Sequence, residues 1–236
     1  PPFTFESPAP VGTVSPPAPF VPAAPANARQ RVTVDGKFFR LGDAKFHPRG
    51  VTYGPFAPDP TGCTFATPEQ TAADFARIRE LGANLLRVYH VPPHWFLDLA
   101  LAQGLRVLVD VAWNKHVCFL DDDASRDGAL ECVRQAAAAC SQHPAVFALS
   151  VVNEIPPDIV RWSGAARVGA FIDDLVRTAK AVDPELLCTF GNFPPTEFLA
   201  AREIDFLCFN VYLHAQRAFE NYLARLQMIE IGRAHV

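Results

Sequence analysis

The sequence predicts an α/β protein built on a parallel sheet, and three observations support this fold class. Apolar segments of strand length alternate with helical segments from about residue 45 to residue 212, which is typical of a parallel sheet with right-handed crossovers. The 236 residues have a hydrophobic fraction of 50%, enough for one large core. No Gly-rich phosphate loop follows any expected strand, and this favours a β/α barrel over a doubly wound sheet.

The N-terminal part is expected to hold a linker and then a hairpin. Residues 1–28 are dominated by Pro, Ala, Val and Phe without any period, as in an extended linker that need not pack and that could join a further fused domain. An Asp35-Gly36 turn follows, flanked by the alternating apolar residues Val32, Val34 and Phe38. Such a pattern predicts a β-hairpin, which we expect to close the bottom of the barrel.

Six segments are expected to form the strands of the parallel sheet. They are residues 45–53, 84–90, 105–113, the apolar part of 143–157, 186–190 and 204–212. Helices are expected between them, the first beginning with the capping box Thr67-Pro68-Glu69-Gln70. The later ones cover residues 93–103, a segment with Leu130 to Cys140 on one face, a segment with Val168 to Ala179 on one face, and residues 219–227.

The second expected strand places an arginine inside the barrel. Leu86 and Val88 alternate with Leu85, Arg87 and Tyr89, so one set faces the helices and the other the interior. Strand parity puts Asp110 in the same interior. We therefore expect an ion pair between Arg87 and Asp110, with or without a role for Arg87 in substrate binding.

The segment from His143 to Pro157 carries the functional signal. It is a continuous apolar run that ends in Asn153-Glu154, and such runs form strands buried on both faces. The carboxyl end of a barrel strand is the active-site face. His-Pro-Ala-Val, a buried strand and then Asn-Glu resembles the clan of retaining glycoside hydrolases with (β/α)8 barrels, closest to the family 2 and family 5 catalytic domains. The alternative is a helix N-cap pair after an ordinary strand.

The resemblance implies a (β/α)8 TIM barrel over residues 29–230, incomplete, with about six of the strands present after the hairpin and the linker. It makes Glu154 the general acid/base of a retaining glycoside hydrolase. The nucleophilic glutamate of the clan ends the seventh strand, which we expect to be missing. Glu230 has no apolar strand before it and is not assigned this role. Residues 231–236 resemble a translated sequencing adapter, and we expect them to be a non-native tail.

The resemblance also implies which residues bind substrate, at the ends of several strands. They are Arg87, His90, Trp113, Asn114, His116, Asn153 and Tyr212. In the clan the arginine supports the nucleophile, the strand-four asparagine binds the sugar 2-hydroxyl and the strand-six tyrosine contacts the nucleophile. A strand-end cap for Asn153 and a loop histidine for His90 stay open as alternatives. Asn210, where family 5 usually has His, favours a family 2-like branch.

Composition excludes some partners. A net charge of −4 and a pI near 6.0 give no reason to expect nucleic acid or an anionic membrane. The six cysteines lack metal-ligand spacing, so reduced core thiols are favoured over a disulfide, and neither a metal nor a cofactor is expected. No segment is long and apolar enough to span a bilayer. The first residue is Pro1 rather than Met, and localisation stays open.

Two functions therefore remain. The first is a β-glycosidase catalytic domain, cut short, that acts on an oligosaccharide, polysaccharide or other glycoside. The second is a non-catalytic carbohydrate-binding or regulatory barrel joined through the Pro-rich linker to another enzyme, such as a glycosyltransferase. A glutamate at the end of the seventh strand would favour the first function, and any other residue there the second.

Overall fold

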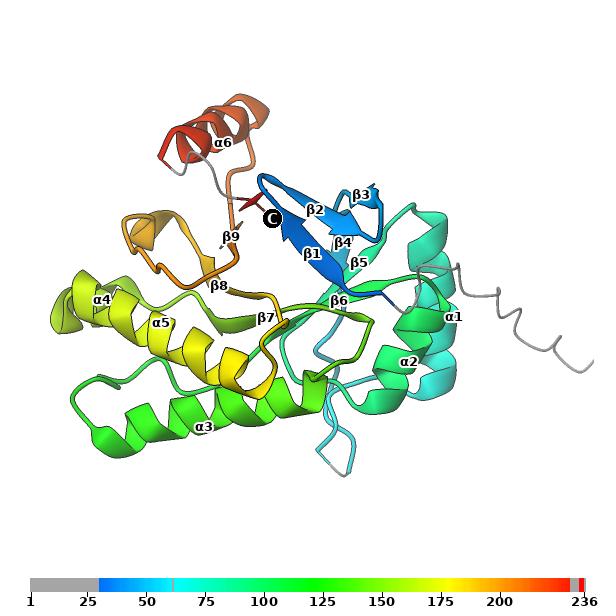
Figure 1. The fold of residues 1–236 in the computed structure, drawn as a ribbon, viewed down its shortest axis with the longest axis horizontal. Coiled ribbons are helices and arrows are strands. Elements are labelled where there is room, and N and C mark those ends of the chain that lie inside the picture. The colour runs from blue at the N-terminus through cyan, green and yellow to red at the C-terminus, as the bar shows by residue number, and fades with distance from the viewer. Residues whose placement is uncertain (1–29, 61, 230–233, 236) are drawn as a thin grey trace, which may run out of the picture.

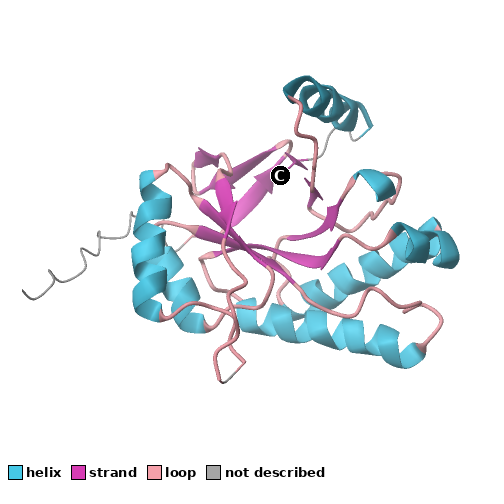
Figure 2. Ribbon diagram, turned by 180° about the vertical axis from the view of Figure 1, so that it is seen from behind, coloured by secondary structure: helices cyan, strands magenta, loops and turns pink. Residues whose placement is uncertain are grey.

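A computed structural model describes residues 30–60, 62–229 and 234–235 of the chain. Six parallel strands, which are hydrogen-bonded in their order along the chain, form a sheet that curls into part of a barrel (Figures 1 and 2). They are β4 (Gly50–Thr52), β5 (Leu85–Val88), β6 (Arg106–Asp110), β7 (Val146–Asn153), β8 (Cys188–Asn192) and β9 (Phe206–Phe209). The fold is thus an incomplete β/α barrel, and the predicted fold class and strand order are confirmed.

Helices cover the outer face of this sheet, except α6, which stands apart beyond β9 (Figures 1 and 2). They are α1 (Pro68–Glu80), α2 (His94–Ala102), α3 (Asp123–Cys140), α4 (Pro157–Ser163), α5 (Ala165–Val182) and α6 (Gln216–Ile229), with a short 3₁₀ turn η1 (Pro194–Thr196). The predicted cap of α1 is present, because Thr67 Oγ1 accepts the Gln70 backbone N–H at 3.3 Å. The short helix α4 was not predicted. Within the described part of the chain, no helix has the length and apolar character needed to cross a membrane.

The expected hairpin closes the bottom of the barrel. Strands β1 (Val32–Asp35), β2 (Phe38–Leu41) and β3 (Ala44–Phe46) form an antiparallel sheet. The Phe39 ring lies between two interior rings of the parallel sheet, with ring centroids 5.1 Å from Phe147 and 5.2 Å from Phe206. This second, smaller core blocks the amino ends of the strands and leaves the carboxyl ends as the accessible face.

The expected first barrel strand, residues 45–53, is divided in the structure. Residues up to Phe46 belong to β3, and the parallel strand begins only at Gly50. Pro48 lies between them and has no N–H to donate to a sheet, which explains the interruption. Gly50 passes close to the next strand, since a Cβ there would lie 2.9 Å from the Leu85 carbonyl oxygen.

Tyr53 lies just past the end of β4, on the helix side of the sheet. Its side chain is buried against the Phe75 and Phe96 rings, and its hydroxyl donates to Asp74 Oδ2 at 2.9 Å. Tyr53 therefore joins the first strand to α1.

The parity expected for the second strand is confirmed. Leu86 and Val88 belong to the large core between sheet and helices, whereas Leu85 belongs to the interior core with Phe39.

All six cysteines are free, and Cys140, Cys188 and Cys208 are buried, as expected for core thiols.

The curled sheet is open between its first and sixth strands. Residues of β4 and β9 line one interior hollow of about 200 Å³ together with Arg87. A two-residue strand, β10 (Ala234–His235), pairs parallel with β9 on its outer edge. It occupies the place expected for a seventh barrel strand. That residues 231–236 are non-native stays a prediction, and Glu230 lies outside the described residues.

Neighbouring phenylalanines on β2 provide a matched test of the bottom core. Phe39 is 2% exposed and Phe38 is 48% exposed. We expect Phe39→Ala to lower the free energy of unfolding by about 3–5 kcal/mol, because a buried ring is replaced by a cavity. Phe38→Ala should change it by less than about 1 kcal/mol. Urea unfolding followed by circular dichroism measures both, and equal losses would contradict the assignment of Phe39 as the closing residue.

Candidate active site

A buried ion pair lies at the carboxyl ends of the parallel strands. Arg87 on β5 donates from Nε to Asp110 Oδ2 at 2.6 Å and from NH2 to Asp110 Oδ1 at 3.2 Å. The two side chains are 16% and 3% exposed. Burial works against the charge on Arg87, but the hydrogen bond and the charge of Asp110 outweigh it and raise the pKa of the guanidinium. The predicted ion pair is therefore present.

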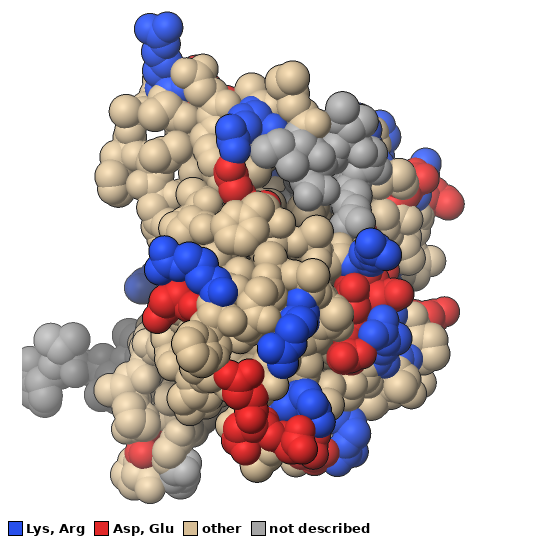
Figure 3. Space-filling model, turned by 90° about the vertical axis from the view of Figure 1, so that its left-hand side faces the viewer, with Lys and Arg blue, Asp and Glu red and all other residues tan. Residues whose placement is uncertain are grey.

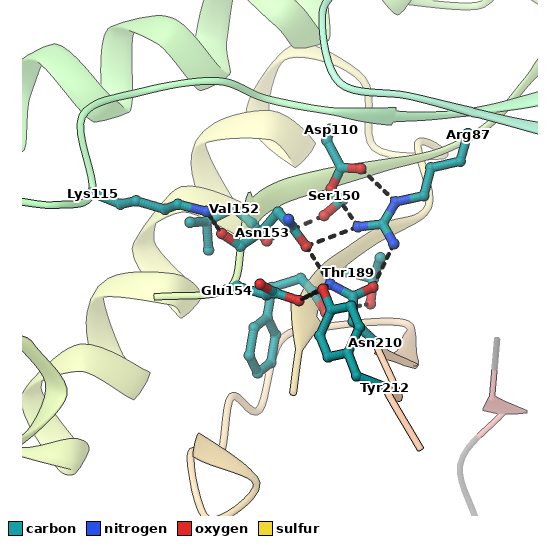
Figure 4. Close-up of polar contacts among 11 residues, drawn as sticks. Arg87, Asp110, Lys115, Ser150, Val152, Asn153, Glu154, Thr189, Asn210 and Tyr212 are labelled. Carbon is teal, nitrogen blue, oxygen red and sulfur yellow. Dashed lines mark hydrogen bonds and ion pairs between the residues drawn. The ribbon is translucent and has the colours of Figure 1, made fainter. Parts of the chain in front are cut away.

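The same guanidinium holds two asparagine side chains (Figure 4). Its NH2 donates to Asn153 Oδ1 at 2.8 Å, and its NH1 donates to Asn210 Oδ1 at 2.5 Å. Asn210 also donates from Nδ2 to Asn153 Oδ1 at 2.7 Å. Asn153 ends β7 and Asn210 follows β9, so one arginine joins the ends of strands that are far apart in the sequence.

Glu154 lies beside this cluster in an unusual backbone conformation. Its φ of +47° falls in the left-handed region, which side chains other than glycine seldom adopt. Its N–H donates to the Gly191 carbonyl oxygen at 2.7 Å. The carboxyl Oε1 accepts from Asn210 Nδ2 at 2.6 Å and from the Tyr212 hydroxyl. The carboxyl group is thus held by donors on the segment after β9.

Gly191 on β8 makes room for this arrangement. A Cβ at that position would lie 2.3 Å from Asn153 Oδ1 and 3.1 Å from Arg87 NH2. Both atoms belong to the hydrogen-bonded cluster, so neither can move without breaking a bond. Only glycine fits at this point.

The Tyr212 hydroxyl donates to Glu154. The contact between this tyrosine and the nucleophile, which the resemblance implied, stays a prediction. The ring is exposed while the hydroxyl points inward (Figure 4). Burial of this hydroxyl, together with the hydrogen bond and the charge of Glu154, raises the pKa of Tyr212 to about 12.

Sequence reasoning missed Lys115, which lies in the loop after β6. Its Nζ donates to the Asn153 carbonyl oxygen. Burial lowers the pKa of the lysine, Arg87 lowers it further, and Glu154 and Asp110 partly oppose this. In the sequence, the only indication that Lys115 belongs to the site was its position after the end of a barrel strand. At that strand end the neighbouring Asn114 and His116 were predicted as site residues instead.

The other expected residues lie outside the hydrogen-bonded cluster. His90 Nδ1 is 3.3 Å from Thr64 Oγ1, which agrees with the alternative of a loop histidine. Trp113 packs edge-on against Phe119 and Phe171 and donates its N–H to the Val151 carbonyl oxygen at 2.9 Å. Asn114 and His116 are exposed on the same loop. Roles for these four in substrate binding stay predictions.

The surface around the site carries mixed charge. Figure 3 views the side at which α3 and α5 begin, and Lys and Arg are interspersed there with Asp and Glu on a mostly uncharged surface. Among the described residues, no group of three or more His, Cys, Asp and Glu side chains could hold a metal ion. The side chains gathered at the site offer guanidinium, carboxyl, amide, phenol and ammonium groups.

The curled parallel sheet and the polar cluster at its strand ends define a β/α-barrel domain of the glycoside hydrolase type. The chain belongs to the family described as glycosyl hydrolases family 2, TIM barrel domain, whose model matches residues 32–229. The predicted family resemblance is confirmed. No curated protein sequence matches the chain.

Solved structures of similar fold include three β-glucuronidases. That of Bacteroides uniformis β-glucuronidase 2 has a TM-score of 0.69 at 18% identity, over 87% of this chain and 26% of its own. The Ruminococcus gnavus enzyme has a TM-score of 0.69 at 16% identity, over 88% of this chain and 37% of its own. The Parabacteroides merdae enzyme has a TM-score of 0.66 at 13% identity, over 87% of this chain and 25% of its own. These identities support the fold alone, and the chain spans less than two-fifths of each structure.

Two Arg–Asp pairs of equal length but unequal burial allow a matched test. Arg40 Nε lies 2.6 Å from Asp35 Oδ2, with side chains 40% and 53% exposed, whereas the pair at Arg87 is buried. We expect Arg87→Met to lower the free energy of unfolding by about 3–5 kcal/mol, because Asp110 is left charged and buried. Arg40→Met should leave it nearly unchanged. Chemical denaturation of both variants checks this, and similar values would mean that Arg87 does not organise the site.

Proposed function

We propose that this chain is part of a retaining glycoside hydrolase in which Glu154 is the general acid/base. The observation that carries the proposal is the placement of the Glu154 carboxyl group. It lies at the carboxyl end of β7, beside the Arg87 cluster, and accepts from Asn210 and Tyr212. Membership of glycosyl hydrolase family 2 supports the reaction class.

The mechanism requires two carboxyl groups, about 5–5.5 Å apart in retaining enzymes. In the first step a nucleophilic carboxylate attacks the anomeric carbon, while Glu154 gives its proton to the departing oxygen. In the second step Glu154 takes a proton from water, which attacks the covalent intermediate and releases the sugar and the nucleophile. We assign the nucleophile to a seventh strand beside β9, and no described residue of this chain is given that role.

We propose a role for each residue of the cluster around Glu154. The carbonyl oxygen of the Asn153 side chain already accepts from Arg87 and Asn210, so we assign its amide N–H to the sugar 2-hydroxyl. Arg87 fixes this asparagine and, in a complete barrel, faces the nucleophile. Tyr212 and Asn210 orient the Glu154 carboxyl group. The substrate is an O-glycoside whose sugar and linkage we leave unassigned.

Removal of the acid/base tests the proposal in a chain that carries the complete barrel. Glu154→Ala should slow the hydrolysis of glycosides with poor leaving groups, because general acid catalysis contributes about 10²- to 10⁴-fold. It should spare the glycosylation step for a dinitrophenyl leaving group, which needs no proton. Added azide should restore turnover and give a glycosyl azide of retained configuration. The measurements are steady-state rates with both substrate classes and identification of the product.

The matched control is Glu131→Ala, which removes an exposed carboxylate on the outer helix α3. It should leave both rates unchanged. If both substrate classes instead slow equally in Glu154→Ala and azide has no effect, Glu154 is not the acid/base. Only a complete barrel that hydrolyses neither substrate class would favour the non-catalytic carbohydrate-binding barrel.

Residues 1–236 alone should not turn over aryl glycosides, because Glu154 cannot form the covalent intermediate. A purified preparation tested for release of nitrophenolate checks this. Activity that disappears in Glu154→Gln would show that a nucleophile is present in the chain after all, and Glu230 would be the first residue to replace.

A further inference from the structure

We propose that Lys115 is a positioning residue, which fixes the Asn153–Glu154 peptide and thereby the direction of the Glu154 carboxyl group. The inference rests on the function proposed above for Glu154. It adds a residue of the loop after β6 to a site that otherwise consists of groups from β5, β6, β7 and the segment after β9.

The geometry places a hydrogen bond on each side of one peptide group. Lys115 Nζ donates to the carbonyl oxygen of Asn153. The N–H of the same peptide belongs to Glu154 and donates to the Gly191 carbonyl oxygen at 2.7 Å. The plane of this peptide is therefore fixed from the β6 side by a lysine and from the β8 side by backbone.

The backbone of Glu154 needs such support. A φ of +47° is disfavoured for a residue with a Cβ, and it persists only where the surroundings hold it. Rotation of the Asn153–Glu154 peptide would relieve this conformation, but it would break the hydrogen bonds to Lys115 and Gly191 and displace the backbone that carries the Glu154 side chain to Asn210 and Tyr212. Lys115 opposes the rotation directly, because it holds the carbonyl oxygen that would have to move.

The charge of Glu154 also acts on Lys115 directly. Burial and the nearby Arg87 lower the pKa of Lys115, while the carboxylates of Glu154 and Asp110 raise it. Glu154 changes charge during the proposed reaction, whereas Asp110 stays paired with Arg87. The ionisation of Lys115 should therefore respond to the charge of Glu154, which reports whether the ammonium group lies close to that carboxyl group, as the hydrogen bond to Asn153 requires.

The first experiment uses the chain as it exists. The chain has four lysines, Lys37, Lys45, Lys115 and Lys180, so an NMR titration of ¹³Cε-labelled lysine resolves each, with assignment by single Lys→Arg variants. In Glu154→Gln, which keeps the shape and removes the charge, the pKa of Lys115 should fall. Lys180, which is paired with Asp205 at 2.8 Å on another part of the molecule, is the matched control and should not change.

The second experiment uses a chain that carries the complete barrel. Lys115→Met should lower kcat at least about tenfold, approaching the 10²-fold loss that a misplacement of about 1 Å can cause. Lys115→Arg should keep most of the activity, because a guanidinium can still donate to the Asn153 carbonyl oxygen. Circular dichroism of both variants separates a change in the site from a loss of fold.

The outcomes separate this inference from the proposed function. If Lys115 titrates identically in the parent chain and in Glu154→Gln, or if Lys115→Met retains full kcat, the positioning role is wrong while Glu154 can still be the acid/base. If azide fails to rescue Glu154→Ala, the proposed function is wrong, whatever the lysine titration gives. A lowered pKa of Lys115 in Glu154→Gln, together with rescue by arginine, supports the inference.

Discussion

The buried Arg87–Asp110 ion pair is the interaction on which the arrangement of the site depends. A guanidinium taken out of water must find acceptors for its donors, since an unpaired buried charge is strongly destabilising. Arg87 finds them on Asp110, Asn153 and Asn210, which belong to β6, the end of β7 and the segment after β9. The curvature that brings these strand ends together is therefore also what satisfies the arginine. The bottom of the barrel is closed by aromatic rings instead. The interior is therefore held by a polar cluster at the carboxyl ends of the strands and by an apolar core at their amino ends.

The same network fixes the Glu154 carboxyl group, to which we assign the acid/base role. Glu154 lies in a disfavoured backbone conformation, donates its N–H to the Gly191 carbonyl oxygen on β8, and accepts hydrogen bonds from the segment after β9. Strain of this kind is typical of functional sites and must be offset by the surrounding structure. Gly191 contributes by leaving space that any side chain would fill. Stability and function thus depend here on the same few contacts.

Much of this could be predicted from the sequence, because periodicity and chain order decide it. Strand order, the closing hairpin and the interior position of Arg87 with its partner Asp110 followed from alternation along each segment. Other features depended on tertiary contacts that no local pattern encodes. Tyr53 lies on the helix side, where Asp74 accepts its hydroxyl, and Trp113 packs against Phe119 and Phe171. Lys115 has no motif of its own and became visible only through the Asn153 carbonyl oxygen.

The most direct test of the central claim is the distance between two carboxyl groups in a crystal structure of a chain that carries the complete barrel. We predict a second carboxylate at the end of a seventh strand, about 5–5.5 Å from the Glu154 carboxyl group, as retention requires. A separation of about 6.5–9.5 Å would indicate inversion and would contradict the covalent mechanism. The absence of any carboxylate at that strand end would contradict the assignment of Glu154 as a catalytic acid/base altogether.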